Sequence, residues 1–259
     1  MRVLVSLLAL ALVVPPPANA EQITVAAAAD LTFAFQDIAA QFQKDTGNSV
    51  KLSFGSSGNF FSQIENGAPY DLFFSADINY PQKLEAAGLV EPGSLYRYAE
   101  GKIVLWVPND SPVDLSRGLK ALLEPGVQKI AIANPEHAPY GRAAVAALQR
   151  EQIYDAVRDK LVLGENISQA AQFVLSSDAD AGILALSLTL APAMKGKGRT
   201  FEIPRSSYPR IEQASVILKS SRKKLLAQQF VDYLRRPTTV ALMRRFGFVA
   251  PEDSAVAHR

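Results

Sequence analysis

Short apolar runs that pass through a turn of small residues directly into a helical pattern recur along this chain. Three of these junctions lie at 28–31 (Ala-Ala-Asp-Leu), 55–59 (Gly-Ser-Ser-Gly-Asn) and 139–141 (Pro-Tyr-Gly). Strands that alternate with helices are typical of an α/β fold with parallel sheets. Because the first backbone N–H groups of a helix have no partner within it, each junction is also a candidate anion site.

The first 20 residues have the pattern of a secretory signal peptide. Arg2 precedes an almost wholly apolar run over 3–14, which is followed by three prolines and the small triplet Ala18-Asn19-Ala20. The apolar run is too short to cross a bilayer core of about 30 Å. We therefore predict cleavage after Ala20 and export of the remaining chain.

Charge and cysteine content exclude several classes of protein. Removing the signal peptide takes away one of the 27 basic residues, which leaves 26 against 25 acidic residues. A nearly neutral chain is not expected to bind nucleic acid. The absence of cysteine excludes disulfides, thiolate metal sites and a lipid anchor on cysteine.

The hydrophobic pattern predicts a chain that crosses twice between two lobes. Apolar strands are expected at 23–28, 50–54, 71–74, 102–107, 129–133, 181–185 and 214–218. Asp30 and Ser168 are expected to cap helices, and Gly47 to follow the end of the first one. We predict a first lobe from residues 21–104 and 206–259 and a second from 105–205, with a ligand cleft between them.

The turn at 55–58 admits more than one function. Its two serines and two glycines suit a compact oxyanion at a helix start, but serine is also an ordinary helix cap. A secreted hydrolase with Ser57 as nucleophile is a remote alternative, since Asn59 stands where the Gly-x-Ser-x-Gly motif needs glycine, and the base would have to be His137 or His258. Clustered metal ligands and nucleotide-binding motifs are missing, so no cofactor and no cation site are expected.

Four segments closely resemble the periplasmic molybdate-binding proteins of the ModA family. They are AAAADL at 26–31, FGSSG at 54–58, QIENGAPYDLFFSAD at 63–77 and NPEHAPYG at 134–141. The resemblance extends from about residue 22 to 248. It implies a type II periplasmic binding protein of two α/β lobes, with mixed, mainly parallel sheets and a double-crossover hinge.

The function implied by this resemblance is transport. The protein would be a periplasmic monomer without enzymatic activity that captures molybdate, and also tungstate, between its lobes and delivers it to an ABC permease. The ligand-binding residues carried over from the family are Ala29, Asp30, Ser56, Ser57, Tyr140 and Ile167, the last through its backbone N–H. A fifth contact, a tyrosine in many relatives, corresponds to Ala185 here, and the Tyr140 phenol is expected to compensate for its loss.

Asp30 departs from the family pattern, because many relatives have serine or asparagine there. An ionised carboxylate next to a dianion is repelled by several kcal/mol at ~4 Å when poorly screened. Three explanations are open. The side chain turns away to cap its own helix, so that only its N–H meets the ligand; the ligand is another oxyanion or a small organic acid; or Asp30 is protonated and donates a hydrogen bond.

Overall fold

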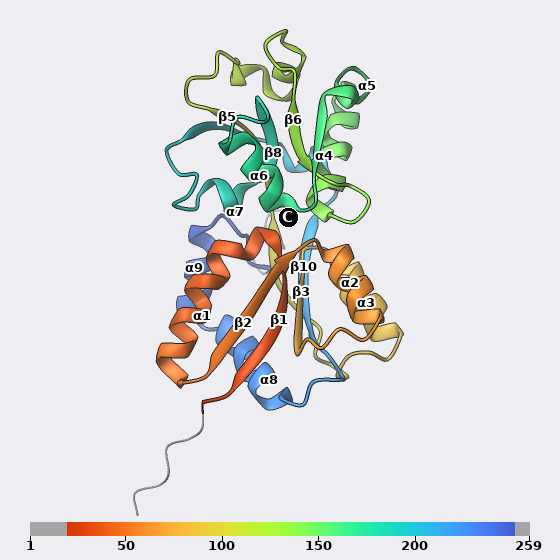
Figure 1. Ribbon diagram of the computed structural model, residues 1–259, viewed down its shortest axis with the longest axis vertical. Coiled ribbons are helices and arrows are strands. Elements are labelled where there is room, and N and C mark those ends of the chain that lie inside the picture. The colour runs from red at the N-terminus through yellow and green to blue at the C-terminus, as the bar shows by residue number, and fades with distance from the viewer. Residues whose placement is uncertain (1–19, 252–259) are drawn as a thin grey trace, which may run out of the picture.

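The computed structural model describes residues 20–251, so nearly all of the predicted signal peptide lies outside the described residues. Two lobes are stacked along the long axis of the molecule (Figure 1). Each lobe is built on a five-stranded sheet with helices packed against it. No helix within residues 20–251 has the length and apolar character that a membrane span requires.

The first lobe contains both described ends of the chain. Its strand order is β2 (Ser49–Gly55), β1 (Gln22–Ala28), β3 (Leu72–Ser75), β10 (Ile211–Ile217) and β4 (Tyr96–Gly101). Strand β1 is parallel to β2 and β3, whereas β10 is antiparallel to β3 and β4. In Figure 1 helices α1 (Thr32–Thr46) and α9 (Pro237–Arg245) lie to the left of this sheet, and α2 (Ser57–Glu65) and α3 (Asn79–Ala86) lie to its right. Helix α8 (Lys224–Leu234) lies at its lower end.

The second lobe repeats this arrangement. Its strand order is β7 (Leu161–Gly164), β6 (Ile130–Ala133), β8 (Ala181–Ala185), β5 (Ile103–Pro108) and β9 (Gly198–Glu202). Its helices are α4 (Pro139–Arg150), α5 (Tyr154–Val157), α6 (Ile167–Leu175) and α7 (Leu186–Thr189). Strand β6 is parallel to both neighbours and β5 is antiparallel to both of its own. The predicted α/β fold with mixed sheets is thus confirmed, but the sheets are not mainly parallel as expected, because each contains two parallel and two antiparallel strand pairs.

Four 3-10 helices complete the described part of the chain: η1 (Ala29–Leu31), η2 (Leu115–Leu123), η3 (Arg158–Lys160) and η4 (Arg205–Ser207).

The chain passes between the two sheets at two places. Strand β4 ends at Gly101 in the first sheet, and β5 begins at Ile103 in the second. The return runs from the end of β9 at Glu202 to the start of β10 at Ile211. These crossings lie close to the predicted boundaries at 104/105 and 205/206, and both belong to the hinge region between the lobes.

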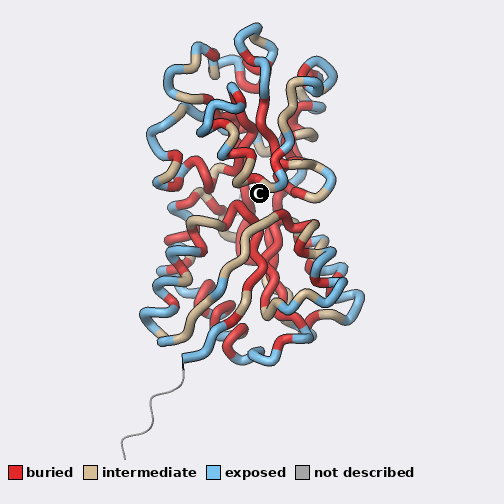
Figure 2. The backbone as a smooth tube through the Cα atoms, in the orientation of Figure 1, coloured by how far each residue is buried: buried red, intermediate tan, exposed pale blue. Residues whose placement is uncertain are grey.

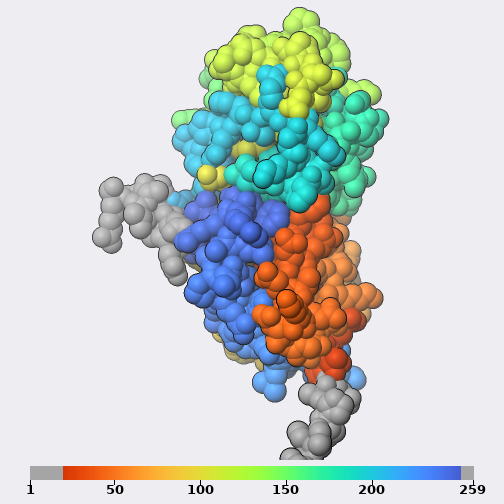
Figure 3. Space-filling view, turned by 90° about the vertical axis from the view of Figure 1, so that its left-hand side faces the viewer, coloured from red at the N-terminus to blue at the C-terminus, as the bar shows by residue number. Residues whose placement is uncertain are grey.

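Buried residues run through both sheets and continue across the junction of the lobes (Figure 2). In the first lobe, aromatic rings from α1, β3 and α8 pack edge to face, with ring centroids 4.9 Å apart for Phe35 and Phe74 and 5.2 Å apart for Phe42 and Phe230. Figure 3 shows the second lobe resting directly on α1 and α9. Gly247, just after α9, lies so close to Leu186 of α7 that a Cβ atom there would come within 2.7 Å of it. The lobes are therefore in a closed arrangement.

Several local predictions are wrong at the helix starts. Asp30 caps no helix, because it lies inside η1, and neither η1 nor α1 has a side-chain cap. The cap of α6 is Asn166, whose side chain accepts hydrogen bonds from the backbone N–H groups of Ser168 and Gln169. Gly47 follows α1 in the left-handed conformation, with φ 77°, as predicted.

Candidate functional site

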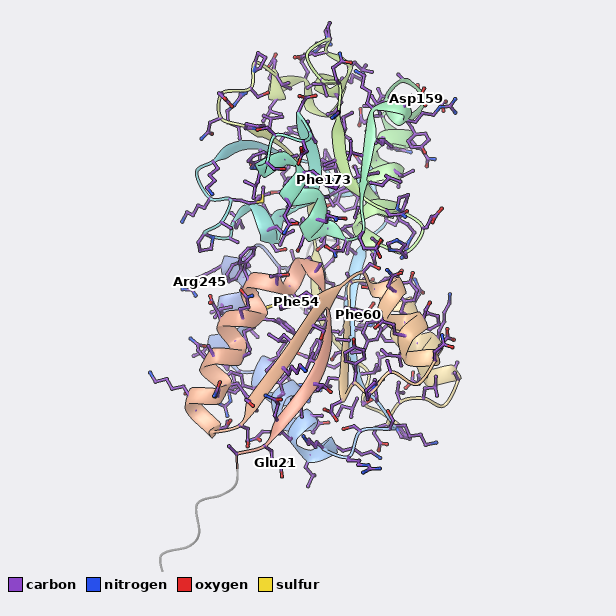
Figure 4. The ribbon with its side chains drawn as sticks, viewed as in Figure 1. Glu21, Phe54, Phe60, Asp159, Phe173 and Arg245 are labelled. Carbon is purple, nitrogen blue, oxygen red and sulfur yellow. The ribbon has the colours of Figure 1, made fainter. Side chains whose placement is uncertain are left out.

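Four helical segments begin at one small cavity at the junction of the lobes. They are η1 after β1, α2 after β2, α4 after β6 and α6 after β7. Phe54 and Phe60, labelled in Figure 4, flank the β2–α2 turn just below this junction. The cavity is lined by Ala28, Ala29, Asp30, Gly55, Ser56, Ser57 and Ala76 of the first lobe, and by Ala138, Pro139, Tyr140, Asn166 and Ile167 of the second.

The cavity is narrow in this closed arrangement. Its free volume is about 10 Å³, which is room for roughly one water molecule. A tetrahedral oxyanion therefore needs the surrounding groups to move apart slightly. A larger groove of about 470 Å³ lies beside β4 and α9, but residues of the first lobe alone line it, so closure of the lobes does not enclose it.

Three backbone N–H groups at the cavity have no partner among the described residues: those of Ser57, Tyr140 and Ile167. Each stands in the first turn of a helix of nine residues or more, where N–H groups lack intrahelical acceptors. At α4 the preceding residue, Pro139, has no N–H, and at α6 the Asn166 side chain bonds only the two N–H groups beyond Ile167. These three donors, from both lobes, suit an anion.

The two serines at the start of α2 have different partners. The Ser57 hydroxyl is fully buried and accepts a hydrogen bond from the backbone N–H of Ala76 at 2.9 Å, so its own hydrogen remains available to a ligand. The Ser56 hydroxyl accepts from the backbone N–H of Asn59 at 3.3 Å and lies 2.8 Å from Nδ1 of His137. Ser56 therefore acts as helix cap and as a contact between the lobes.

Asp30 is held in a buried polar network at the hinge. Its Oδ2 accepts hydrogen bonds from the Tyr140 hydroxyl at 2.9 Å and from the Gln213 amide at 2.6 Å. The Tyr98 hydroxyl donates in turn to Oε1 of Gln213 at 2.8 Å. Oδ1 of Asp30 is buried and has no hydrogen-bond partner. The side chain thus points toward α4 and β10, which rules out the explanation in which it caps its own helix.

Burial controls the protonation of this network. Loss of hydration raises the pKa of Asp30 from 3.8 to about 6, although the hydrogen bonds from Gln213 and Tyr140 act in the opposite direction. Burial, together with the nearby charge of Asp30, raises the pKa of Tyr140 well above its usual value. The phenol stays neutral, and Asp30 can change its charge near neutral pH.

Several further contacts join the lobes around the cavity. The hydroxyls of Ser168 and Ser187 donate to the carbonyl oxygens of Ala29, at 2.9 Å, and Asp30, at 2.8 Å. The backbone N–H of Gly58 donates to the carbonyl of His137 at 2.9 Å. These hydrogen bonds can form only when the lobes are closed.

An ion pair and a further hydrogen bond also cross between the lobes. Arg142 of α4 forms an ion pair with Asp77 at 2.6 Å, and Asn59 donates a hydrogen bond to Glu165.

The structure brings all six predicted site residues to the same cavity. Ala185 is not among the lining residues; it precedes α7, whose Ser187 reaches the backbone of Asp30. The Tyr140 phenol, expected to donate to the ligand, donates to Asp30.

Sequence reasoning missed Asn166 and Gln213. Asn166 follows a strand and precedes a helix, which is a readable cap signal, and Gln213 is a polar residue within a buried strand.

The arrangement offers neither a cation site nor the hydrolase geometry expected for Ser57. Within residues 20–251 no three His, Cys, Asp or Glu side chains are placed to hold a metal ion. No lysine or arginine is among the described residues that line the cavity. Of the two histidines considered as base, His137 contacts Ser56, while the Ser57 hydroxyl faces the N–H of Ala76. His258 lies outside the described residues.

Comparison with known proteins gives consistent results. Residues 23–249 match a family described as bacterial extracellular solute-binding protein. The protein named molybdate-binding protein ModA of Azotobacter vinelandii is 40% identical over 231 residues, covering 89% of this chain and 91% of its own. The ModA protein of Rhodobacter capsulatus is 37% identical over 242 residues, covering 93% and 94% of the two chains.

Solved structures agree with these sequence matches. The Azotobacter vinelandii periplasmic molybdate-binding protein superposes with a TM-score of 0.84 at 38% identity, covering 88% of this chain and 99% of that one. The sulfate-binding protein SubI of Mycobacterium tuberculosis shares the fold, with a TM-score of 0.74 at 17% identity over 92% of this chain and 89% of its own.

Proposed function

Because the chain belongs to the ModA family of bacterial extracellular solute-binding proteins, we propose that it captures molybdate between its lobes and passes it to an ABC permease in the membrane. The observation that carries this proposal is the convergence of three unpartnered helix N–H groups, from both lobes, on one cavity. The matched relatives are named as binding proteins, and we propose the same non-catalytic role here, for a monomer in the periplasm.

Neutral donors can replace the water around a dianion. Hydrogen bonds to a charged group contribute roughly 1.5–3 kcal/mol each, and a helix N-terminus adds about 0.3–1 kcal/mol, more when buried. The N–H groups of Ser57, Tyr140 and Ile167 and the Ser57 hydroxyl provide four such donors. They would contact the oxygen atoms of molybdate, so the metal itself needs no protein ligand.

Selectivity would follow from size. Molybdate and tungstate present the same tetrahedron of four oxygens and two charges, so we propose that both bind. Sulfate is smaller, and donors spaced for molybdate would be left without full contact around it. An ion enclosed by both lobes must enter while they are open, so the inter-lobe contacts would form as it binds.

The test is a calorimetric and thermal-shift screen of the mature chain with molybdate, tungstate, sulfate, phosphate and small organic acids. We expect molybdate and tungstate to raise the melting temperature, since a ligand present at 100 times its Kd stabilises the folded state by about 2.7 kcal/mol. Saturating molybdate that produces neither heat nor a shift would refute the proposal. A response to an organic acid alone would instead support the alternative that the Asp30 carboxyl group suggests.

A matched pair of serine variants tests the location of the site. Ser57→Ala removes one charge-assisted hydrogen bond and should weaken molybdate binding roughly 10- to 150-fold. Ser62→Ala changes an exposed serine of the same helix and should bind as the unmodified protein does. Equal affinities for the two variants would place the ligand elsewhere.

A further inference from the structure

We propose that the site holds its dianion with Asp30 as the neutral acid, so that each anion bound brings one proton from the solvent onto the Asp30 carboxyl group. This inference rests on the proposed function and adds a regulation of the same site by pH. In the free protein Asp30 is a carboxylate. When the anion binds, one proton moves from the solvent onto this carboxylate, and no other group gains or loses a proton.

The hydrogen bonds of Asp30 show where the proton would reside. Oδ2 already accepts from Tyr140 and Gln213, at 2.9 and 2.6 Å. Oδ1 is buried without a partner, on a residue that lines the cavity and is 1% exposed. A proton on Oδ1 would convert this unpartnered acceptor into an O–H donor beside the anion, which would then act together with the N–H donors at the helix starts.

The surroundings of Asp30 provide no charge that could balance a carboxylate next to a dianion. Burial, although opposed by the hydrogen bonds from Gln213 and Tyr140, already raises the pKa of Asp30 to about 6, and a dianion nearby raises it further. The elements packed against η1 are α1, α6, α7 and β2. Helices α6 and α7 carry no titratable side chain. The charged side chains of α1 and β2 are exposed to solvent: Asp37, Lys44, Asp45 and Lys51.

The side chains in contact with Asp30 are also neutral. Tyr140 and, through Gln213, Tyr98 complete the network, and burial raises the pKa of both phenols well above the ordinary value. Arg142, the cation on α4, is paired with Asp77. Among the side chains of this network, Asp30 is therefore the one that can take up a proton near neutral pH. His137, which contacts Ser56 at the same cavity, is a further titratable side chain, and Asp30→Asn distinguishes uptake at Asp30 from uptake elsewhere.

Proton uptake makes affinity depend on pH in a defined way. While the free protein carries the carboxylate and the complex carries the acid, Kd rises about tenfold for each unit of pH. We expect this rise from pH 7 to 8 and from pH 8 to 9. Asp30→Asn has a permanent N–H donor and nothing to titrate, so its Kd should stay constant over the same range.

Titration calorimetry measures the proton directly. The mature chain is titrated with sodium molybdate at pH 8 in cationic buffers of different ionisation enthalpy, such as Tris and imidazole, and the dependence of the heat on the buffer gives the protons taken up. We expect close to one proton per anion for the unmodified chain and none for Asp30→Asn. Asp37→Asn, which removes an exposed acid from the neighbouring helix, should retain the full uptake.

The outcomes separate the two proposals. Molybdate binding by the unmodified chain without proton uptake would overturn this inference and leave the proposed function intact. Uptake that persists in Asp30→Asn would overturn it as well, because another group would then hold the proton. Failure to bind molybdate at any pH would overturn the proposed function and this inference together. Should Asp30→Asn not fold, the uptake by the unmodified chain still decides.

Discussion

Gly58 lies where the two lobes approach each other closely, which makes it a sensitive place to test closure. It is the second residue of α2 in the first lobe, and a Cβ atom there would come within 2.6 Å of the backbone oxygen of His137 in the second lobe and 2.8 Å of the Tyr80 hydroxyl. A backbone oxygen cannot rotate away as a side chain can. In Gly58→Ala the lobes must therefore separate by roughly 1 Å to restore ordinary contact distances.

The free-energy cost of this separation has two parts. The hydrogen bond from Gly58 N–H to the His137 carbonyl contributes about 0.5–1.5 kcal/mol, and an overpacked contact costs about 1–3 kcal/mol. Together these weaken the closed state by about 1.5–4.5 kcal/mol, so the Kd for molybdate should rise roughly 10- to 2,000-fold. The ligand-free protein should melt no lower than before, because alanine is a better helix former than glycine and the open lobes avoid the clash with His137. The Tyr80 hydroxyl, in the same lobe as Gly58, is the end of a side chain and can shift.

Calorimetry measures the affinity, and small-angle scattering measures how far the saturated protein closes. Gly126→Ala is the matched control, because a Cβ atom at Gly126 meets no atom within 4 Å and its φ is not positive. An unchanged molybdate affinity in Gly58→Ala would refute the reasoning, since the closed arrangement would then not be the one that holds the ligand.

Two further predictions concern the inter-lobe ion pair and Asp30. Arg142→Ala removes the partly exposed ion pair with Asp77 and should speed molybdate dissociation about two- to fivefold in stopped-flow displacement. The control Arg158→Ala removes an ion pair within the second lobe and should leave the rate unchanged. Equal rates for the two variants would show that the Arg142–Asp77 pair does not resist opening of the lobes. Because the pKa of Asp30 in the closed arrangement, about 6, lies above its ordinary 3.8, the stability of the closed protein should fall as pH rises from 4 to 6. The free energy of unfolding, measured with urea, should fall by up to about 3 kcal/mol over this range, since two pKa units correspond to that free energy. Asp30→Asn should not show this fall, and the same pH dependence in both proteins would contradict the prediction.

The parts of the site that depend on neighbours in sequence were predictable. Each junction from a strand to a helix is a local pattern, so the starts of η1, α2 and α4 could be expected from the residues at 28–31, 55–59 and 139–141. Asparagine at position 166 is an equally local signal for the start of α6, but the serine two residues later competed with it as the expected cap. That these helix starts meet at one cavity could be predicted only from the family resemblance, because closure joins residues that are more than 60 positions apart in the sequence.

Asp30 shows why local rules failed at the hinge. An aspartate just before an apolar helical pattern is usually a cap, yet its partners here, Tyr140 and Gln213, lie 110 and 183 residues away. Strand β4 was missed for a different reason. It lies at the edge of its sheet and contains Arg97 and Glu100, so its residues do not form the continuous apolar run from which the other strands were predicted.

Two glycines show that closure is built into the sequence in a form that local reasoning does not detect. A Cβ atom at Gly58 would strike the opposite lobe, and one at Gly101, at the first crossing, would strike the Tyr140 hydroxyl and lie 2.9 Å from the Gln213 amide. Neither residue has positive φ, so the conformation of the backbone does not demand glycine at either position. Glycine is needed at these two positions only when the lobes close, because the absence of a side chain there leaves room for the segment at the start of α4 to approach α2 and the hinge network. Selection of the ligand by size and control of Asp30 by burial therefore depend on the same close approach, and a change that keeps the lobes apart should weaken both together.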